Sequence, residues 1–149
     1  MSKVFDWFKR SEGEWISNRR YYYESSGKNQ LVKSDLAVEL TESKDNEFKV
    51  KLIWDSTGDI SSNGEMLCEF DSDNSILHRN VGYMTSDPTD SYVTMLDEDT
   101  ILFKTEYDGM VFREEIRLID EDIRLRQTLG WKNSTVILAG QYYEKRKNA

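Results

Sequence analysis

Short segments in which apolar and polar residues alternate follow one another from Trp15 almost to the end of the chain. Turn-forming residues interrupt the alternation about every ten residues, which leaves ten strand-length segments and no room for crossover helices. Strands joined by such short connections pair antiparallel. Nine breaks separate the segments: Ser25–Asn29, Lys44–Asn46, Asp55–Gly58, Asp71–Asn74, Ser86–Pro88, Asp97–Asp99, Asp108–Gly109, Asp120–Asp122 and Lys132–Asn133.

The segments predict an all-β fold, a ten-stranded antiparallel up-and-down β-barrel that forms a single domain over residues 1–149. Closure is favoured because it removes the unpaired edges of the sheet. A barrel of this width is too large for side chains alone to fill, so it can hold a small ligand. Asp108–Gly109 is the strongest hairpin signal, and the apolar residues of Val4–Arg10 predict a short N-terminal helix that covers one end of the barrel.

The same alternation predicts which side chains point into the barrel, because successive residues of a strand face opposite sides. The later segments alternate most cleanly, with lysine, arginine or glutamate between the apolar positions. The predicted interior positions are Trp15, Ser17, Arg19, Tyr21 and Tyr23, then Val50, Leu52 and Trp54, then Met66, Cys68 and Phe70, then Ile101, Phe103, Thr105 and Tyr107, and finally Phe112, Glu114, Ile116 and Leu118.

Composition narrows the classes of function. A net charge of -8 argues against nucleic acid or an anionic membrane as the main partner. No apolar run approaches the roughly 20 residues of a membrane helix, and the first residues lack the layout of a secretory signal. The single cysteine, Cys68, excludes a disulfide framework and fits the reducing cytoplasm, while one histidine and one cysteine argue against a zinc site.

Polar residues on the predicted apolar faces are the candidates for chemistry. Glu114 lies between Phe112 and Ile116, and a buried carboxylate needs a cation or N–H donors, so Arg19 or Arg124 is its expected partner. Alternation with Ile123 and Leu125 favours outward-pointing side chains for Arg124 and Arg126. If these arginines pointed inward instead, they would form a fork for carboxylates. His78 is expected at the surface or rim, and Cys68 as a small buried hydrophobe.

The opening of the barrel resembles that of the lipocalins. Gly13-Glu14-Trp15 is similar to their Gly-x-Trp signature, in which the tryptophan packs at the closed end of the barrel against an arginine from a late strand. The motif becomes more specific because ten strand-length segments in sequential order follow it. The resemblance implies a barrel of the lipocalin or fatty-acid-binding-protein type.

A narrower resemblance covers most of the chain. Phe8–Tyr22 is similar to the pattern Phe-x-x-Ser-x-Gly-x-Trp-x-Ser-x-Arg-x-Tyr-His that opens the S/U-type phycobiliprotein lyases. Tyr22 replaces the histidine of that pattern, and Thr128 replaces a serine. The Glu121-Asp122 turn is a residue short, so either Glu114 or Glu115 could match the glutamate of the family, and strand parity favours Glu114. The other similar stretches are Ser34–Leu40, Trp54, Thr105–Tyr107, Glu114–Arg117 and Ile123–Thr128.

This resemblance implies that the barrel binds a linear tetrapyrrole, phycoerythrobilin or phycocyanobilin, as substrate and holds no permanent cofactor. It implies attachment of the bilin to a cysteine of a phycobiliprotein subunit, so Cys68 would not be the nucleophile. A bilin reductase as donor of the pigment, a homodimer and a role as chromophore chaperone are further implications. Under this reading Arg124 and Arg126 point inward.

The resemblance also assigns roles to individual residues. Glu114 and Arg124 are the candidate catalytic residues, with Glu114 accepting hydrogen bonds from the pyrrole N–H groups. The candidate bilin-binding residues are Arg19, Arg124 and Arg126 for the propionates, Trp54, Tyr21 and Tyr107 for the rings, and in addition Thr128 and Glu115.

Two other functions fit the same pattern. A passive carrier of a small hydrophobic carboxylate, such as a fatty acid, would need only an apolar cavity and one arginine. An interaction barrel with a filled core would bind no ligand at all. Absorbance changes of an added bilin separate the first alternative from a lyase, and ligand-dependent melting temperatures separate the second.

Overall fold

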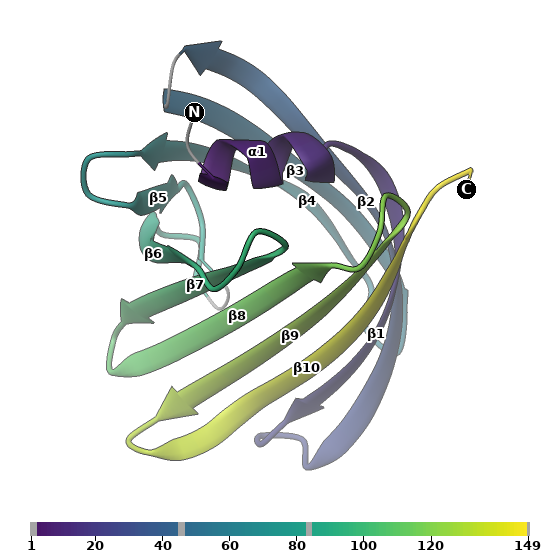
Figure 1. The fold of residues 1–149 in the computed structure, drawn as a ribbon. Coiled ribbons are helices and arrows are strands. Elements are labelled where there is room, and N and C mark those ends of the chain that lie inside the picture. The colour runs from purple at the N-terminus through teal and green to yellow at the C-terminus, as the bar shows by residue number, and fades with distance from the viewer. Residues whose placement is uncertain (1–2, 45–46, 83–84, 149) are drawn as a thin grey trace.

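The structure is a computed structural model that describes residues 3–44, 47–82 and 85–148, and within them it shows one helix followed by ten strands (Figure 1). No helix in this part of the chain has the length and apolar character needed to cross a membrane. The elements are α1 (Lys3–Ser11), β1 (Gly13–Tyr23), β2 (Lys28–Lys44), β3 (Glu47–Gly58), β4 (Ser62–Asp71), β5 (Ile76–Arg79), β6 (Thr89–Met95), β7 (Thr100–Tyr107), β8 (Met110–Leu118), β9 (Ile123–Lys132) and β10 (Thr135–Arg146).

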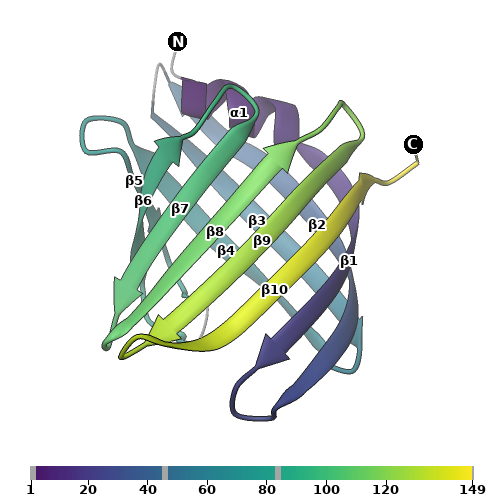
Figure 2. The same ribbon diagram turned by 60° about the horizontal axis from the view of Figure 1, so that its bottom comes forward.

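Each strand pairs antiparallel with the next one along the chain, and β10 pairs with β1 to close the barrel (Figure 2). The closing pair is long, since its register runs from Trp15 opposite Arg146 to Tyr23 opposite Leu138. The predicted ten-stranded antiparallel barrel with a short N-terminal helix is confirmed. Short connections impose the antiparallel order, and closure leaves no open edge.

Two hairpins have turns in which both central residues adopt positive φ. The β7–β8 turn has Asp108 at φ 50° and Gly109 at φ 74°, and the β9–β10 turn has Asn133 at φ 50° and Ser134 at φ 67°. Such turns match the right-handed twist of the strands that they join, and Asp-Gly adopts them readily. The strongest hairpin signal of the sequence therefore coincides with a tight turn.

Three predicted boundaries are wrong. β3 continues through the predicted break at Asp55–Gly58, because Ser56 keeps the inward alternation and its hydroxyl donates to Ser34 Oγ at 3.0 Å. β2 begins at Lys28, inside another predicted break. β5 covers only Ile76–Arg79 of the predicted strand Ile76–Met84, whose last two residues lie outside the described residues.

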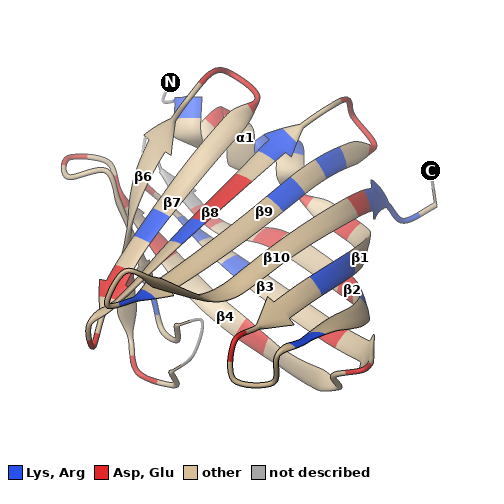
Figure 3. Cartoon of the chain, turned by 90° about the horizontal axis from the view of Figure 1, so that it is seen from below, with Lys and Arg blue, Asp and Glu red and all other residues tan. Residues whose placement is uncertain are grey.

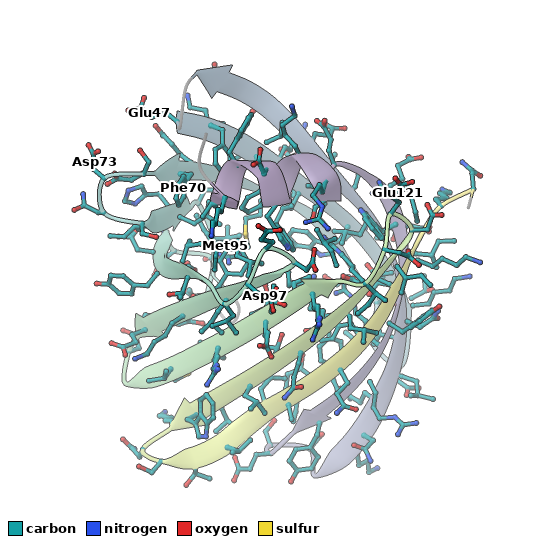
Figure 4. The ribbon with its side chains drawn as sticks, in the orientation of Figure 1. Glu47, Phe70, Asp73, Met95, Asp97 and Glu121 are labelled. Carbon is teal, nitrogen blue, oxygen red and sulfur yellow. The ribbon has the colours of Figure 1, made fainter. Side chains whose placement is uncertain are left out.

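Helix α1 lies across one end of the barrel and contributes a large part of the core. Its apolar residues Val4, Phe5, Trp7 and Phe8 are all buried, and the ring centres of Phe8 and Phe103 lie 6.2 Å apart. The helix therefore closes this end, as predicted. Figure 4 labels residues at the same end of the barrel: Glu47 at the start of β3, Phe70 of β4, Met95 of β6, and the loop residues Asp73, Asp97 and Glu121.

Polar contacts hold the helix in this position. The indole N–H of Trp7 donates to the backbone carbonyl of Asp99 at 2.9 Å, and Arg10 Nη2 donates to the carboxylate of the same residue at 2.8 Å. Trp15 follows directly in β1 and is fully buried, with the guanidinium carbon of Arg146 4.3 Å from its ring centre. The expected packing of this tryptophan against an arginine from a late strand is thus confirmed.

Candidate functional site

The barrel encloses a cavity of about 320 Å³. It extends from Trp7 and Phe8 of the helix to Ile60 and Gly82 at the other end of the barrel. Ligand pockets in proteins are typically about 300–1,000 Å³ and mostly apolar, with a few placed polar groups. Side chains do not fill the interior, so the part of the chain that the structure describes can accept a small molecule.

One wall of the cavity carries a buried ion pair between β8 and β9. Arg126 donates from Nε and Nη2 to Oε2 of Glu114, at 3.0 and 2.7 Å. The Thr128 hydroxyl donates to the same oxygen at 3.2 Å and is also hydrogen-bonded to the Tyr142 hydroxyl at 3.2 Å. Burial alone would raise the pKa of Glu114, but the charges of Arg126 and Arg79 outweigh it and lower the pKa, so the carboxylate stays ionised.

A second carboxylate lies beside this pair, on β10. Glu144 is completely buried, and its Oε1 accepts a hydrogen bond from Arg124 Nε at 2.7 Å. Its Oε2 lies 3.9 Å from both Arg19 Nη2 and Arg126 Nη1. Although burial would raise the pKa of Glu144, these three arginines lower it to about 2. Figure 3 shows acidic positions along β8 and β10 and basic positions along β1 and β9, the strands from which these charges come.

Aromatic rings surround these charges. The guanidinium carbons of Arg19 and Arg126 lie 4.9 and 4.8 Å from the ring centre of Tyr142, and Arg19 Nη1 donates to the Tyr21 hydroxyl at 3.1 Å. Burial and the neighbouring Tyr21 raise the pKa of Tyr142 well above its ordinary value, so this phenol stays neutral. The planar cations are held on ring faces, where cation–π attraction fixes their orientation.

Trp54 contributes a large flat surface on the β3 side of the cavity. Its indole N–H donates to Ser62 Oγ at 3.3 Å. The ring lies directly over Gly64 of β4, where an added Cβ would come within 2.8 Å of the indole. The absence of a side chain at this glycine therefore makes room for the tryptophan.

Six of the nine candidate site residues line the cavity: Arg19, Tyr21, Trp54, Glu114, Arg124 and Arg126. Thr128 is buried behind this lining and reaches it through its bond to Glu114. Glu115 is not part of the cavity wall, because parity places it on the outer face of β8. Tyr107 stacks on Phe112 at 5.5 Å near the β7–β8 turn and is not among the lining residues either.

Two expectations drawn from the residues alone were wrong. Alternation favoured outward arginines, but Arg124 and Arg126 point inward, as the resemblance to the lyases implied, because Glu144 and Glu114 compensate their charges inside. The partner of Glu114 is Arg126 rather than Arg19 or Arg124. The outward residue between the two arginines is Leu125, which is 45% exposed.

Sequence reasoning missed three interior residues: Arg79, Tyr142 and Glu144. All three are buried. Strand parity could have identified them as interior residues. Arg79 lies on the same strand face as Leu77, and Tyr142 and Glu144 lie on the same inward face as Leu138.

The other chemically reactive side chains lie apart from the cavity lining. Cys68 is buried, and burial raises the pKa of its thiol. His78 lies on the outer surface, with Nδ1 2.6 Å from Asp90 Oδ1. Residues 3–44, 47–82 and 85–148 contain no group of three or more His, Cys, Asp or Glu side chains placed to hold a metal ion.

Comparison with known proteins relates this barrel to a family. Matches to the sequence model of the CpeS-like proteins cover residues 3–60 and 51–147. A candidate phycocyanobilin lyase, CpcS 2 of Nostoc sp., is 30% identical over 97% of this chain and 91% of its own length. A candidate chromophore lyase, CpcV of Picosynechococcus sp., is 27% identical over 93% of this chain and 79% of its own length.

Solved structures show the same fold. The S-type phycobiliprotein lyase CPES of Guillardia theta has a TM-score of 0.76 at 20% identity, covering 100% of this chain and 94% of its own. A protein of unknown function from Nostoc punctiforme, of the DUF3598 family, has a TM-score of 0.64 at 14% identity over 93% of this chain and 48% of its own. The family match over nearly the whole chain confirms the resemblance seen in the sequence, and the chain belongs to the CpeS-like family.

Proposed function

We propose that this protein is a phycobiliprotein lyase, which binds a linear tetrapyrrole in its barrel and promotes thioether attachment of the pigment to a cysteine of a phycobiliprotein subunit. The observation that carries the proposal is the cavity, whose lining combines Arg19, Arg124 and Arg126 with Trp54 and Tyr21. The relatives of this chain include a candidate phycocyanobilin lyase and a candidate chromophore lyase, which supports the same conclusion.

The lining suits the chemistry of an open-chain bilin. Guanidinium groups bind carboxylates through paired hydrogen bonds, so the inward arginines would receive propionate groups. Trp54 would stack against the conjugated rings, and Tyr21 would border them. Glu114 stays ionised and could accept hydrogen bonds from pyrrole N–H groups, which favours the protonated pigment.

In the proposed reaction the acceptor cysteine adds through its sulfur to the ethylidene group on ring A. One carbon–sulfur bond forms, the carbon–carbon double bond becomes single, and the thiol proton ends on the neighbouring carbon. The barrel contributes by holding one pigment conformer and excluding water and other nucleophiles, as a chaperone for the chromophore does. A bilin reductase would supply the pigment, and the acceptor protein would supply the thiol.

Absorbance spectroscopy tests the binding step. Purified protein is mixed with phycocyanobilin, and in parallel with phycoerythrobilin, and a red-shifted, sharpened band is expected because the barrel selects one extended protonated conformer. A passive carrier of hydrophobic carboxylates would leave the band almost unchanged. That outcome, with both pigments, would contradict the proposal.

A pair of tryptophan substitutions tests where the pigment binds. Trp54→Phe is expected to shift the bound absorbance band, because the indole lies in the cavity wall. Trp131→Phe is the matched control, since Trp131 lies on β9 outside the cavity lining and its loss should leave the band in place. Equal shifts in the two variants, or none in either, would remove Trp54 from the site.

Co-production tests the transfer step. The protein is made together with a bilin and one acceptor subunit, and covalent pigment on the subunit is detected by zinc-induced fluorescence after denaturing electrophoresis. Attachment above the level without the lyase is expected for at least one subunit. Tight bilin binding without any increase in attachment would mean that the protein is a carrier.

A further inference from the structure

A fourth arginine, Arg79, lies inside the barrel on the wall opposite the other three. Its side chain lines the cavity and is 5% exposed. It belongs to β5, whereas Arg19 is on β1 and Arg124 and Arg126 are on β9, each four strands away around the closed barrel. The cavity therefore has cationic groups on two facing walls.

The contacts of Arg79 hold its guanidinium group in a defined position. Its Nε donates to Ser91 Oγ at 2.8 Å, and that hydroxyl is 2.6 Å from Thr105 Oγ1. Its guanidinium carbon lies 5.0 Å from the ring centre of Phe103, and Nη1 contacts Met66 Sδ at 3.5 Å. A buried cation whose side chain is already held in position loses little conformational entropy when it binds an anion.

The charges around the cavity divide into two parts. In the described residues Arg19, Arg124 and Arg126 cluster with Glu114 and Glu144, which leaves that side with one net positive charge. Arg79 adds one positive charge on the facing wall, and this charge helps to lower the pKa of Glu114. Guanidinium groups on two facing walls of one cavity suit a ligand with two separate carboxylates.

We propose that Arg79 is a specificity-determining residue that binds one propionate of the bilin, while the cluster of Arg19, Arg124 and Arg126 binds the other. This inference rests on the proposed function, since it assigns a subsite within the same cavity. Arg79 thereby sets the orientation of the pigment across the barrel, and it selects for the free dicarboxylate over its esters.

Binding of phycocyanobilin and of its dimethyl ester tests the assignment. Arg79→Met keeps a side chain of similar length but removes the charge, and it is expected to weaken binding of the free acid by about tenfold to a hundredfold, since a charge-assisted hydrogen bond contributes about 1.5–3 kcal/mol. Binding of the dimethyl ester should change by less than about twofold, because the lost partner is the charged carboxylate. Arg113→Met, on the exposed face of β8, is the control and should change neither affinity.

The outcomes separate this inference from the proposed function. If the wild type binds neither compound, the proposed function fails. If the wild type binds the free acid and Arg79→Met weakens both compounds equally, or weakens neither, only the role of Arg79 is overturned. If Arg79→Met does not fold, Arg79→Lys is used instead, because it keeps the charge without the planar guanidinium group. A loss of affinity for the free acid that exceeds the loss of affinity for the dimethyl ester still supports the subsite. Equal effects of Arg79→Lys on both compounds would overturn it.

Discussion

Single residues show how the barrel carries charge in an interior that is otherwise aromatic and aliphatic. Glu114 and Glu144 are 2% and 0% exposed, yet both have a lowered pKa, because arginines on the neighbouring strands contact them. Removing one partner of a buried ion pair typically costs about 3–5 kcal/mol, since the other charge is left uncompensated. Each carboxylate therefore supports the position of an arginine that a ligand would use.

The low pKa of Glu144 predicts a specific dependence of stability on pH. Its pKa is about 2 in the folded protein against an ordinary value of 4.5, so its contribution is complete above pH 4.5 and is lost as the pH falls from 4.5 towards 2. Fully expressed, that contribution is about 3 kcal/mol. In urea unfolding, the stability difference between wild type and Glu144→Gln should shrink over this range. Glu106→Gln is the control, because Glu106 is an exposed carboxylate on β7. If the stability difference between wild type and Glu144→Gln stays constant with pH, the prediction is contradicted.

Cys68 should be dispensable for pigment transfer. The side chain is 3% exposed and its thiol pKa is raised by burial, so the reactive thiolate is disfavoured. Cys68→Ala is expected to lower stability by about 1 kcal/mol through lost packing and to leave the rate of chromophore attachment unchanged. Transfer assays and urea unfolding measure the two effects. Lost transfer with bilin binding retained would assign the thiol a chemical role.

At this scale the sequence predicts which positions are interior better than it predicts their partners. Parity alone places Glu114 correctly, because apolar residues flank it on the same face. It fails for Arg124 and Arg126, whose strand alternates large apolar with charged residues, so either face could be buried. The choice depends on the carboxylates of β8 and β10, and pairing across strands is not visible in one segment.

At the scale of elements, the turns fix the register of the hairpins. Gly109 has φ 74° and an added Cβ would meet no atom within 4 Å, so its role is conformational rather than steric. The preceding Asp108, at φ 50°, has the same backbone handedness with a side chain that tolerates it. Strand pairing on both sides depends on this geometry.

Substitution in this turn separates backbone strain from function. Gly109→Ala is expected to lower the free energy of unfolding by about 1–2 kcal/mol, since a residue with a Cβ is strained in the left-handed region. Asp108→Gly should change stability by less than about 0.5 kcal/mol, because it relieves the same strain while loosening the unfolded chain. Thermal melting measures both variants. A loss for Asp108→Gly as large as that for Gly109→Ala would show that side-chain contacts, not backbone conformation, stabilise the turn.

The turn residues in the sequence predict the hairpins well but give a wrong end for β3. Asp55-Ser56-Thr57-Gly58 has the composition of a turn, but Ser56 finds a buried hydroxyl partner in Ser34 on the adjacent strand, so the strand continues. Small polar residues favour turns only where no ladder partner competes for them. A single sequence does not reveal that competition.

At the scale of the whole molecule, the closed barrel and the cavity inside it occur together. The ten strands and the helix produce a core concentrated at the helical end, while the cavity extends away from it. The number of segments predicted both the closed barrel and the space inside it. The resemblance placed Glu114, Arg124 and Arg126 in that space, but the pairing of its charges could not be predicted, since the charged groups come from β1, β5, β8, β9 and β10.

Ligand binding should stabilise the whole barrel. At a free phycocyanobilin concentration of 100 times its Kd, linkage predicts a gain of about 2.7 kcal/mol. For a chain of this size the gain corresponds to a rise in Tm of about 5–10 °C. A straight-chain fatty acid at the same concentration is the control, and it should give a smaller shift because it carries a single carboxylate. No shift with either bilin would indicate a barrel that serves only protein contacts, and an equal shift with the fatty acid would indicate a general carrier.

The helix across one end makes the cavity a blind pouch rather than a tunnel, with Trp7 and Phe8 as its floor. A long pigment that enters a cavity closed at one end has its last-entered part nearest the opening. Ring A must therefore enter last if a thiol at the opening is to reach it without the pigment turning around inside. The direction of threading, settled before any bond forms, would then decide which end of the pigment becomes tethered.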